Sequence, residues 1–281
     1  MNVVVITPQL SVAKGFSDFS PIFRWRKYFE KESIRHRVIN PDEHWRPTKK
    51  DADICILDYR WYQRKEKAKA HTNLIRLDST PKYVIEILQD YKKLGLRIVF
   101  FDTRDSPGSE SLDILPFVDA FWKKQLFDDM TYYTKLLNKN FMTWLPPEHK
   151  DGRDAVFKPA EERFLYKLKC AWNIGLCDFR SNMVHPKIPN AFMPFKSYLL
   201  SWKLNNTELS KRELLLSFRG SSNKHPSYDW QRNLTKEKLV NFDGKIVLGK
   251  KVNKAKYLEE QQNSIAVISP FGWGEICYRD F

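Results

Sequence analysis

Short runs of β-branched and aromatic residues alternate along this chain with longer stretches whose apolar residues recur at helical spacing. Such alternation is typical of βαβ units, which build parallel sheets. We therefore predict an α/β protein. In the first half the predicted strands are 3–6, 53–57, 97–101, 120–123 and 141–144, with a weaker one near Val38. In the second half the predicted strands are 170–174, 214–218, 245–248 and 266–268, with helices at 228–239 and 253–262.

The clearest predicted helix lies between two strands of the first half. Ser79 or Thr80 is a suitable N-cap residue, Pro81 suits the first turn, and Gly95 is a typical stop. The apolar residues of this helix recur on one face, which indicates packing against a core rather than a ligand site. They are Val84, Ile87, Leu88 and Tyr91.

A polar, turn-rich stretch at 146–152 follows the last predicted strand of the first half. The length of 281 residues fits two domains. We predict an N-terminal, acceptor-side Rossmann-like domain at 1–150 and a C-terminal nucleotide-sugar-binding Rossmann-like domain at 151–281. Ligands of such folds bind at the carboxyl ends of the strands, which predicts a cleft between the two sheets.

Basic residues outnumber acidic ones, with 48 Lys and Arg against 34 Asp and Glu, a formal net charge of +14. This excess favours anionic partners. Several kinds of partner carry the required negative charge: nucleic acid, an anionic membrane surface, a nucleotide diphosphate and an acidic polymer. The charge alone does not choose among them, so motifs must decide.

The cysteines, Cys55, Cys170, Cys177 and Cys277, form no CxxC pair and match no histidine spacing of a zinc site. We expect them to be reduced, and we expect no metal site. The apolar run at 3–6 is too short for a secretory signal, and no run of 18 apolar residues exists. We therefore expect a cytoplasmic protein whose basic surface can contact an anionic membrane peripherally.

The richest segment for chemistry is 269–281, after the last predicted strand. Gly272 and Gly274 flank Trp273 between that strand and a helix, an arrangement that lets backbone approach an anion at a helix N-terminus. Glu275 in the first turn can accept hydrogen bonds from sugar hydroxyls, and Arg279 can pair with phosphate. The alternative is a glycine-capped turn followed by a Glu275–Arg279 ion pair.

Another strand, 214–218, runs directly into Arg219, Gly220 and Ser221. A guanidinium at a strand end can clamp a diphosphate bidentately, and the small residues supply space and donors. The alternative is an arginine that caps a surface turn. Two such strand ends in one domain favour a nucleotide-diphosphate site more than either alone.

Several segments of the second half resemble the donor-binding domain of exostosin-like and family-1-like glycosyltransferases of the GT-B type, which have two Rossmann domains. These segments are Phe218 to Gly220, Tyr257-Leu258, and 269–275 with Arg279. The resemblance covers roughly the last 70 residues. It implies that Arg219, Glu275 and Arg279 contact a nucleotide-diphosphate sugar, which is a donor substrate and not a permanently bound cofactor. Many relatives continue with further strands and a returning helix, whereas this chain ends at Phe281. The resemblance therefore implies either a truncated form or a shortened C-terminal domain.

An inverting transferase also needs a general base for the acceptor hydroxyl. Asp102 and Asp105, at the end of the strand 97–101, are the candidates from the first half, with His149 as a weaker one. The alternative is an Asp-rich turn held by its own backbone. Glu275 completes the candidate catalytic residues.

These observations predict a glycosyltransferase of polysaccharide or glycoconjugate synthesis. It would transfer a sugar from a nucleotide-diphosphate donor to a glycan or lipid-linked acceptor. The alternative from another class is a non-catalytic protein that binds nucleic acid or an anionic polymer through its basic surface. As a partner of the predicted transferase, nucleic acid is not expected.

Overall fold

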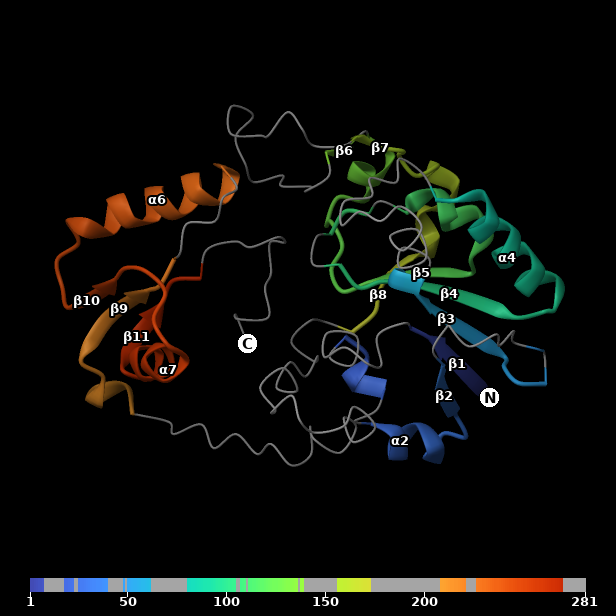
Figure 1. The fold of residues 1–281 in the computed structure, drawn as a ribbon, viewed down its shortest axis with the longest axis horizontal. Coiled ribbons are helices and arrows are strands. Elements are labelled where there is room, and N and C mark those ends of the chain that lie inside the picture. Colours follow the sequence, from blue (N-terminus) through green and yellow to red (C-terminus); the bar gives the residue numbers. More distant parts are fainter. Residues whose placement is uncertain are drawn as a thin grey trace. The chain divides into compact units, whose positions relative to one another are not determined.

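The structure is a computed structural model (Figure 1). It describes residues 1–7, 18–22, 25–39, 48, 50–61, 80–104, 107–109, 111–135, 137–138, 156–172, 208–220 and 226–269. The chain divides into two compact units. The first unit is Met1–Phe141 with Ala155–Leu200, and the second is Met142–Asp154 with Ser201–Phe281.

The first unit is built on a six-stranded sheet in the order β2-β1-β3-β4-β5-β8, with every neighbouring pair parallel (Figure 1). Its central strands are nearly continuous apolar runs because both faces of a parallel sheet are covered. The strands are β1 Asn2–Ile6, β2 Arg35–Ile39, β3 Ile54–Asp58, β4 Arg97–Asp102, β5 Ala120–Lys123 and β8 Leu168–Cys170.

Shorter elements complete the first unit. The helices are α2 Arg26–Lys31 and α4 Lys82–Lys93, and residues 18–22 are also helical. The 3₁₀ turns are η1 Leu112–Phe117, η2 Met130–Thr134 and η4 Glu162–Lys167. A two-stranded antiparallel ribbon joins β6 Leu137–Asn138 to β7 Val156–Phe157.

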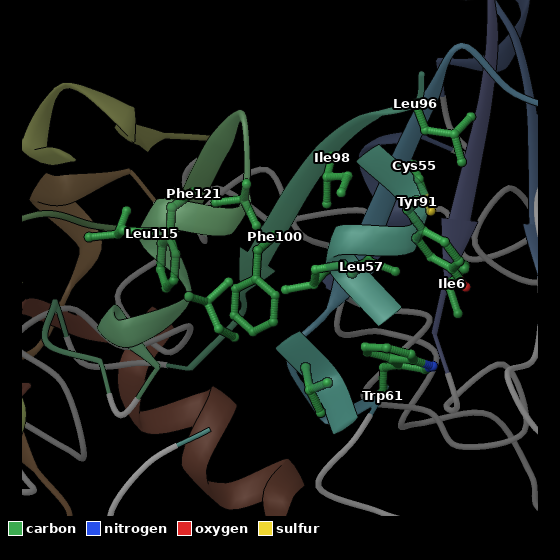
Figure 2. Packing of buried hydrophobic residues seen from close by; sticks show 14 of the residues in the cluster. Ile6, Cys55, Leu57, Trp61, Tyr91, Leu96, Ile98, Phe100, Leu115 and Phe121 are labelled. Atoms are coloured by element: carbon green, nitrogen blue, oxygen red, sulfur yellow. The ribbon is translucent and has the colours of Figure 1, made fainter. Parts of the chain in front are cut away.

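Two apolar clusters cover the two faces of this sheet. On one face α4 packs its buried Val84, Leu88 and Tyr91 against the strands, together with Phe100 and Phe121, whose ring centroids are 5.1 Å apart. Figure 2 shows this packing around Leu57, Ile98 and Phe100. The cluster on the other face consists of Val5, Phe19, Ile22, Ile56, Val99 and Phe101. The predicted core stripe of the helix is therefore confirmed.

The start of α4 differs from the prediction. Pro81 precedes its first residue, and no side chain caps the helix. Thr80 instead donates from its backbone N and its Oγ1 to the Asp113 carboxylate, at 2.7 and 2.5 Å. The predicted stop is confirmed, since Gly95 follows with a φ of 76° that a side chain would disfavour.

Strand β8 corrects the prediction of a strand at 170–174 in the C-terminal domain. It lies slightly earlier, at Leu168–Cys170, and pairs with β5 in the sheet of the first unit. Its partner was unpredictable from local sequence because strand pairing is a long-range contact. The predicted domain boundary after residue 150 and the predicted strand at 141–144 lie outside the described residues.

The second unit contains a three-stranded parallel sheet in the order β10-β9-β11. The described elements alternate as the sequence predicts, so this unit and the first are both α/β and compatible with Rossmann-like folds. They are η8 Leu209–Lys211, β9 Leu214–Phe218, α6 Pro226–Val240, β10 Ile246–Leu248, α7 Lys254–Gln262 and β11 Ser264–Val267.

The two described cysteines are expected to react very differently. Cys55 is fully buried in β3, and burial raises the pKa of its thiol to about 12, whereas Cys170 is exposed. In a chain with Cys177→Ser and Cys277→Ser, a disulfide reagent at about pH 8 should label Cys170 rapidly and Cys55 only on unfolding. Peptide mass spectrometry distinguishes the sites. Comparable labelling rates in the folded chain would contradict the burial of Cys55.

Candidate functional site

The carboxyl edge of the six-stranded sheet gathers buried polar side chains. Its strand order contains the 2-1-3-4-5 order of doubly wound folds, in which the order of the strands reverses between the first and third strands. Ligands of such folds bind at the carboxyl ends near that reversal. Here Thr7, Asp58, Asp102 and Lys123 stand at or directly after the ends of β1, β3, β4 and β5, and all four are fully buried.

Two adjacent strands end in the same short sequence, Asp-x-Arg. After β3 it is Asp58-Tyr59-Arg60, and after β4 it is Asp102-Thr103-Arg104. In both, the backbone N–H of the arginine donates to Oδ1 of the aspartate at 3.1 Å. In both, the guanidinium also returns to the same carboxylate. We call these the paired Asp-x-Arg turns.

The first turn is tied to the helical residues 18–22. Thr7 Oγ1 donates to Asp58 Oδ2 at 2.7 Å, and Arg60 Nη2 donates to Asp18 Oδ2 at 2.8 Å. Lys124 Nζ reaches the other oxygen of Asp18 at 3.3 Å. Two buried carboxylates and two cations therefore form one connected network.

The second turn is tied to β5. Arg104 holds Asp102 bidentately, with Nε and Nη2 at 2.8 and 2.9 Å from the two carboxylate oxygens. Lys123 Nζ donates to Asp102 Oδ2 at 3.0 Å, and Arg104 Nη2 reaches Ser109 Oγ at 3.0 Å. One carboxylate is thus shared by two cations.

Successive side chains of a strand point to opposite faces of the sheet, so the two networks lie on opposite faces. Asp58 follows Ile56 on the face covered by Phe19 and Ile22, whereas Asp102 follows Phe100 on the face covered by α4. Tyr59 bridges them, because the guanidinium carbons of Arg60 and Arg104 lie 4.7 and 4.9 Å from its ring centroid. The edge cluster consists of Thr7, Asp18, Asp58, Tyr59, Arg60, Asp102, Arg104, Lys123 and Lys124.

Burial and charge shift the ionisation of this cluster. Burial raises the pKa of the Asp102 carboxyl, but the nearby charges of Arg104 and Lys123 outweigh it and hold that pKa well below its ordinary value. Burial lowers the pKa of Lys123 to about 8, although Asp102 opposes the shift. Burial raises the pKa of Asp58 despite the charge of Arg60. The cluster therefore carries paired charges in a dry setting.

This geometry revises the expected role of Asp102. A general base must reach the acceptor proton and have a pKa near the working pH. Asp102 is fully buried and its lone pairs are taken by Arg104 and Lys123. We infer that it orients these cations rather than accepting a proton. Asp105, the other candidate at this strand end, lies outside the described residues, and so does His149.

In the second unit Arg219 directly follows β9, as predicted. Its Nε and Nη2 donate to both oxygens of Glu260 from α7, at 2.7 and 2.6 Å. This hydrogen bonding raises the pKa of Arg219 and lowers that of Glu260. Arg219 Nη1 also lies 3.4 Å from the carbonyl oxygens of Leu248, the last residue of β10, and of Lys250. Thus Glu260, which the sequence did not single out, fixes the orientation of Arg219.

Two glycines make room for this arrangement. Gly249 has a φ of 144°, and a Cβ there would lie 2.8 Å from Arg219 Nη1. A Cβ at Gly220, a predicted loop residue, would overlap the ring of Phe218. Any larger residue would therefore displace the backbone or the side chains beside Arg219.

The remaining predicted site residues lie outside the described residues, so their geometry stays a prediction. They are Ser221, Gly272, Trp273, Gly274, Glu275 and Arg279. Across the described ranges no group of three or more His, Cys, Asp or Glu is placed to hold a metal ion. In the same ranges, no helix combines the length and apolarity needed to cross a bilayer.

Sequence reasoning missed Asp58, Arg60 and Lys123 as site residues. A usable signal was present, because the same Asp-x-Arg sequence follows two successive apolar strands. Parallel strands bring their carboxyl ends to one edge, so a repeated strand-end sequence places like groups side by side. Lys123 gave no such signal, since a lysine at a strand end is usually solvated.

Comparisons of this chain with protein-family models, with curated proteins and with solved structures find no match.

Proposed function

We propose that this protein is a glycosyltransferase of the two-domain GT-B type. It would transfer a sugar from a nucleotide-diphosphate donor to a glycan or lipid-linked acceptor. Two observations support this function: the resemblance of the C-terminal segment to donor-binding domains, and the local geometry around Arg219. The acceptor would bind the first unit and the donor the second.

The supporting observation is the position of Arg219 at the carboxyl end of β9. In the order β10-β9-β11 the next two strands lie on opposite sides of β9, and open α/β sheets bind ligands where the strand order reverses in this way. Glu260 holds the guanidinium bidentately, and the side chain of Arg219 is 16% exposed. Such a fixed cation is suited to a diphosphate and loses little side-chain freedom on binding.

The chemistry would be displacement at the anomeric carbon of the donor. Negative charge develops on the departing nucleotide diphosphate, and Arg219 would stabilise it. Glu260 would keep the guanidinium in place before the donor arrives. The planar fork of Arg219 would matter more than its charge alone, since a lysine at position 219 would keep the positive charge but lose the fork.

A nucleotide-binding experiment tests the proposal. Titration calorimetry with UDP, GDP, ADP and CMP should find saturable binding of one nucleotide, which Arg219→Lys weakens by about tenfold. Lys211→Ala, which removes an exposed charge of the same unit paired only with Glu208, should change nothing. The matching nucleotide sugar then enters a transferase assay.

The same titrations test the polymer-binding alternative. If only a short oligonucleotide binds, with steep loss of affinity on adding salt and no effect of Arg219→Lys, the transferase proposal is wrong. A single diphosphate site would have a much shallower salt dependence, because it neutralises fewer phosphates.

A further inference from the structure

Helix α2 exposes two aromatic side chains that its packing on the sheet does not use. The helix spans six residues, none of them fully buried, and lies beside β2 (Figure 1). Its packing includes Phe29, whose ring centroid is 6.1 Å from that of His36 on β2. Trp25 and Tyr28, by contrast, are 50% and 67% exposed. Because short helices are normally stabilised by burying their apolar side chains, these exposed rings indicate a surface that meets a partner.

The exposed rings form a continuous stripe with a lysine. Trp25, Tyr28 and Lys31 follow one another every three residues, so they lie along one side of the helix. The ring centroids of Trp25 and Tyr28 are 6.3 Å apart, and Lys31 Nζ lies 5.7 Å from the Tyr28 centroid. We call these three residues the α2 stripe. It combines apolar surface with positive charge.

More positive charge lies next to the α2 stripe. From Trp25 to Arg35 the chain has four basic residues and two acidic ones. The basic residues are Arg26, Lys27, Lys31 and Arg35, and the acidic ones are Glu30 and Glu32. Arg26 pairs with Glu30 at 2.8 Å, whereas the exposed Lys27 pairs with no acidic side chain in the described part of the chain. This excess of positive charge complements an anionic surface.

An anionic membrane surface fits these features. Trp and Tyr are enriched at membrane–water interfaces, where the ring enters the headgroup region and its polar atom stays hydrated. Lys and Arg beside them are attracted to anionic headgroups. Exposed aromatic rings and unpaired lysines on one short helix therefore have a single partner that satisfies both.

Other partners fit the α2 stripe less well. At their observed exposure the two rings offer roughly 200–300 Å². Each partner of a standard protein interface buries about 800 Å², so the rings are too small for stable self-association. The rings are also tilted by 52°, whereas successive bases of a nucleic acid would stack on rings that lie nearly parallel.

We propose that the α2 stripe, together with Lys27, docks the first unit on an anionic lipid bilayer. Trp25 and Tyr28 enter the headgroup region, and Lys27 and Lys31 contact the negative headgroups. This surface does not depend on the proposed transferase function. If the acceptor of that function is lipid-linked, docking holds the protein at the membrane that contains its acceptor.

Flotation of the full chain with lipid vesicles tests the proposal. The chain should float with vesicles of phosphatidylcholine and phosphatidylserine, and much less with phosphatidylcholine alone, because the attraction needs anionic headgroups. Trp25→Ala with Tyr28→Ala should lower the partition coefficient by about tenfold. Lys27→Gln with Lys31→Gln should lower it by about tenfold or more.

Two matched variants are the controls. Tyr166→Ala removes a ring that is also 67% exposed in the same unit. Lys82→Gln with Lys93→Gln removes the same charge from exposed positions of α4. Both should change the partition coefficient by less than about twofold, because neither touches α2. Circular dichroism checks that each variant is folded.

Three results would overturn the proposal. One is the absence of flotation with phosphatidylserine vesicles. Another is an equal loss of flotation in the α2 variants and in their controls, which would show that only net charge matters. The third is an effect of the α2 substitutions on oligonucleotide binding or on dimerisation but not on flotation. Arg219→Lys should leave flotation intact, so failure of the nucleotide site and failure of this surface are distinguishable.

A second measurement needs no substitution and so covers a variant that fails to fold. Hydrogen exchange of the unaltered chain is followed by peptide mass spectrometry with and without phosphatidylserine vesicles. Peptides that contain residues 25–31 should exchange several-fold more slowly with vesicles, because the bilayer shields the exposed helix from water. Peptides from α4 should exchange at the same rate in both. Unchanged exchange at 25–31 in samples that float would contradict the surface.

Discussion

Replacing Asp102 by Asn is expected to lower the free energy of unfolding of the first unit by about 3–5 kcal/mol. The substitution keeps the volume but removes the carboxylate shared by Arg104 and Lys123. Lys123 is fully buried, so its charge would lose its anionic partner in a dry environment, and the single amide oxygen could not serve both cations. Urea unfolding, followed by hydrogen exchange of peptides from β3 to β5, measures the loss in this unit.

The loss should depend on pH. In the unaltered protein the pKa of Lys123 is about 8, below that of the unfolded chain. Its folded state therefore binds fewer protons above about pH 8, and its contribution to stability rises with pH there. Without Asp102 the lysine releases its proton at lower pH, so this rise begins earlier. The stability difference should be larger at about pH 6 than at about pH 9.

Two variants make this prediction specific. Asp102→Asn with Lys123→Met should recover part of the loss, because it also removes the buried ammonium that the single substitution leaves without a carboxylate. Asp90→Asn, at an aspartate 62% exposed and paired with Lys93, should change stability by at most about 1 kcal/mol. Equal losses for Asp90→Asn and Asp102→Asn would show that burial of the Asp102 pair does not matter.

The other large effect is expected from Phe100→Ala, at about 3–5 kcal/mol. Phe100 of β4 is fully buried in the same apolar cluster as the α4 residues, with its ring near that of Phe121 (Figure 2). Truncation removes apolar contact area and leaves a cavity that close packing fills only in part. The same unfolding measurement applies to this variant.

Phe100→Leu and Tyr28→Ala are the controls for this core prediction. Leucine refills part of the volume, so its loss should be the smaller of the two substitutions at position 100. Tyr28 is 67% exposed on α2, and its truncation should fall within about 1 kcal/mol. A loss at Phe100 no greater than that at Tyr28 would be inconsistent with the described core.

The two proposals assign different ligands to the two units. In the second unit Arg219 is held by Glu260 and would bind the nucleotide diphosphate of the donor. Fixing a cation before the ligand binds lowers the entropy lost on binding, which suits one ligand of defined shape. In the first unit Lys27 and Lys31 lie on an exposed helix and would meet a surface whose charge is spread over many lipids.

The sequence by itself determined the elements whose signals are local. β5 and β9 lie at their predicted bounds, and α4 ends before Gly95 with its apolar stripe buried. These assignments succeed because the spacing of apolar residues and the positions of proline and glycine determine the conformation of nearby residues. The predicted position of Arg219 at a strand end is confirmed for the same reason.

Only the tertiary structure decided which strands pair and which charges meet. β8 joined the first sheet, although we predicted this strand in the C-terminal domain, because pairing joins residues far apart in the chain. Asp102 looked like a candidate base until β5 placed Lys123 beside it, and Arg219 gained Glu260 from 41 residues away. The ionisation and orientation of a buried side chain depend on the partners that folding brings to it, and local sequence does not name those partners.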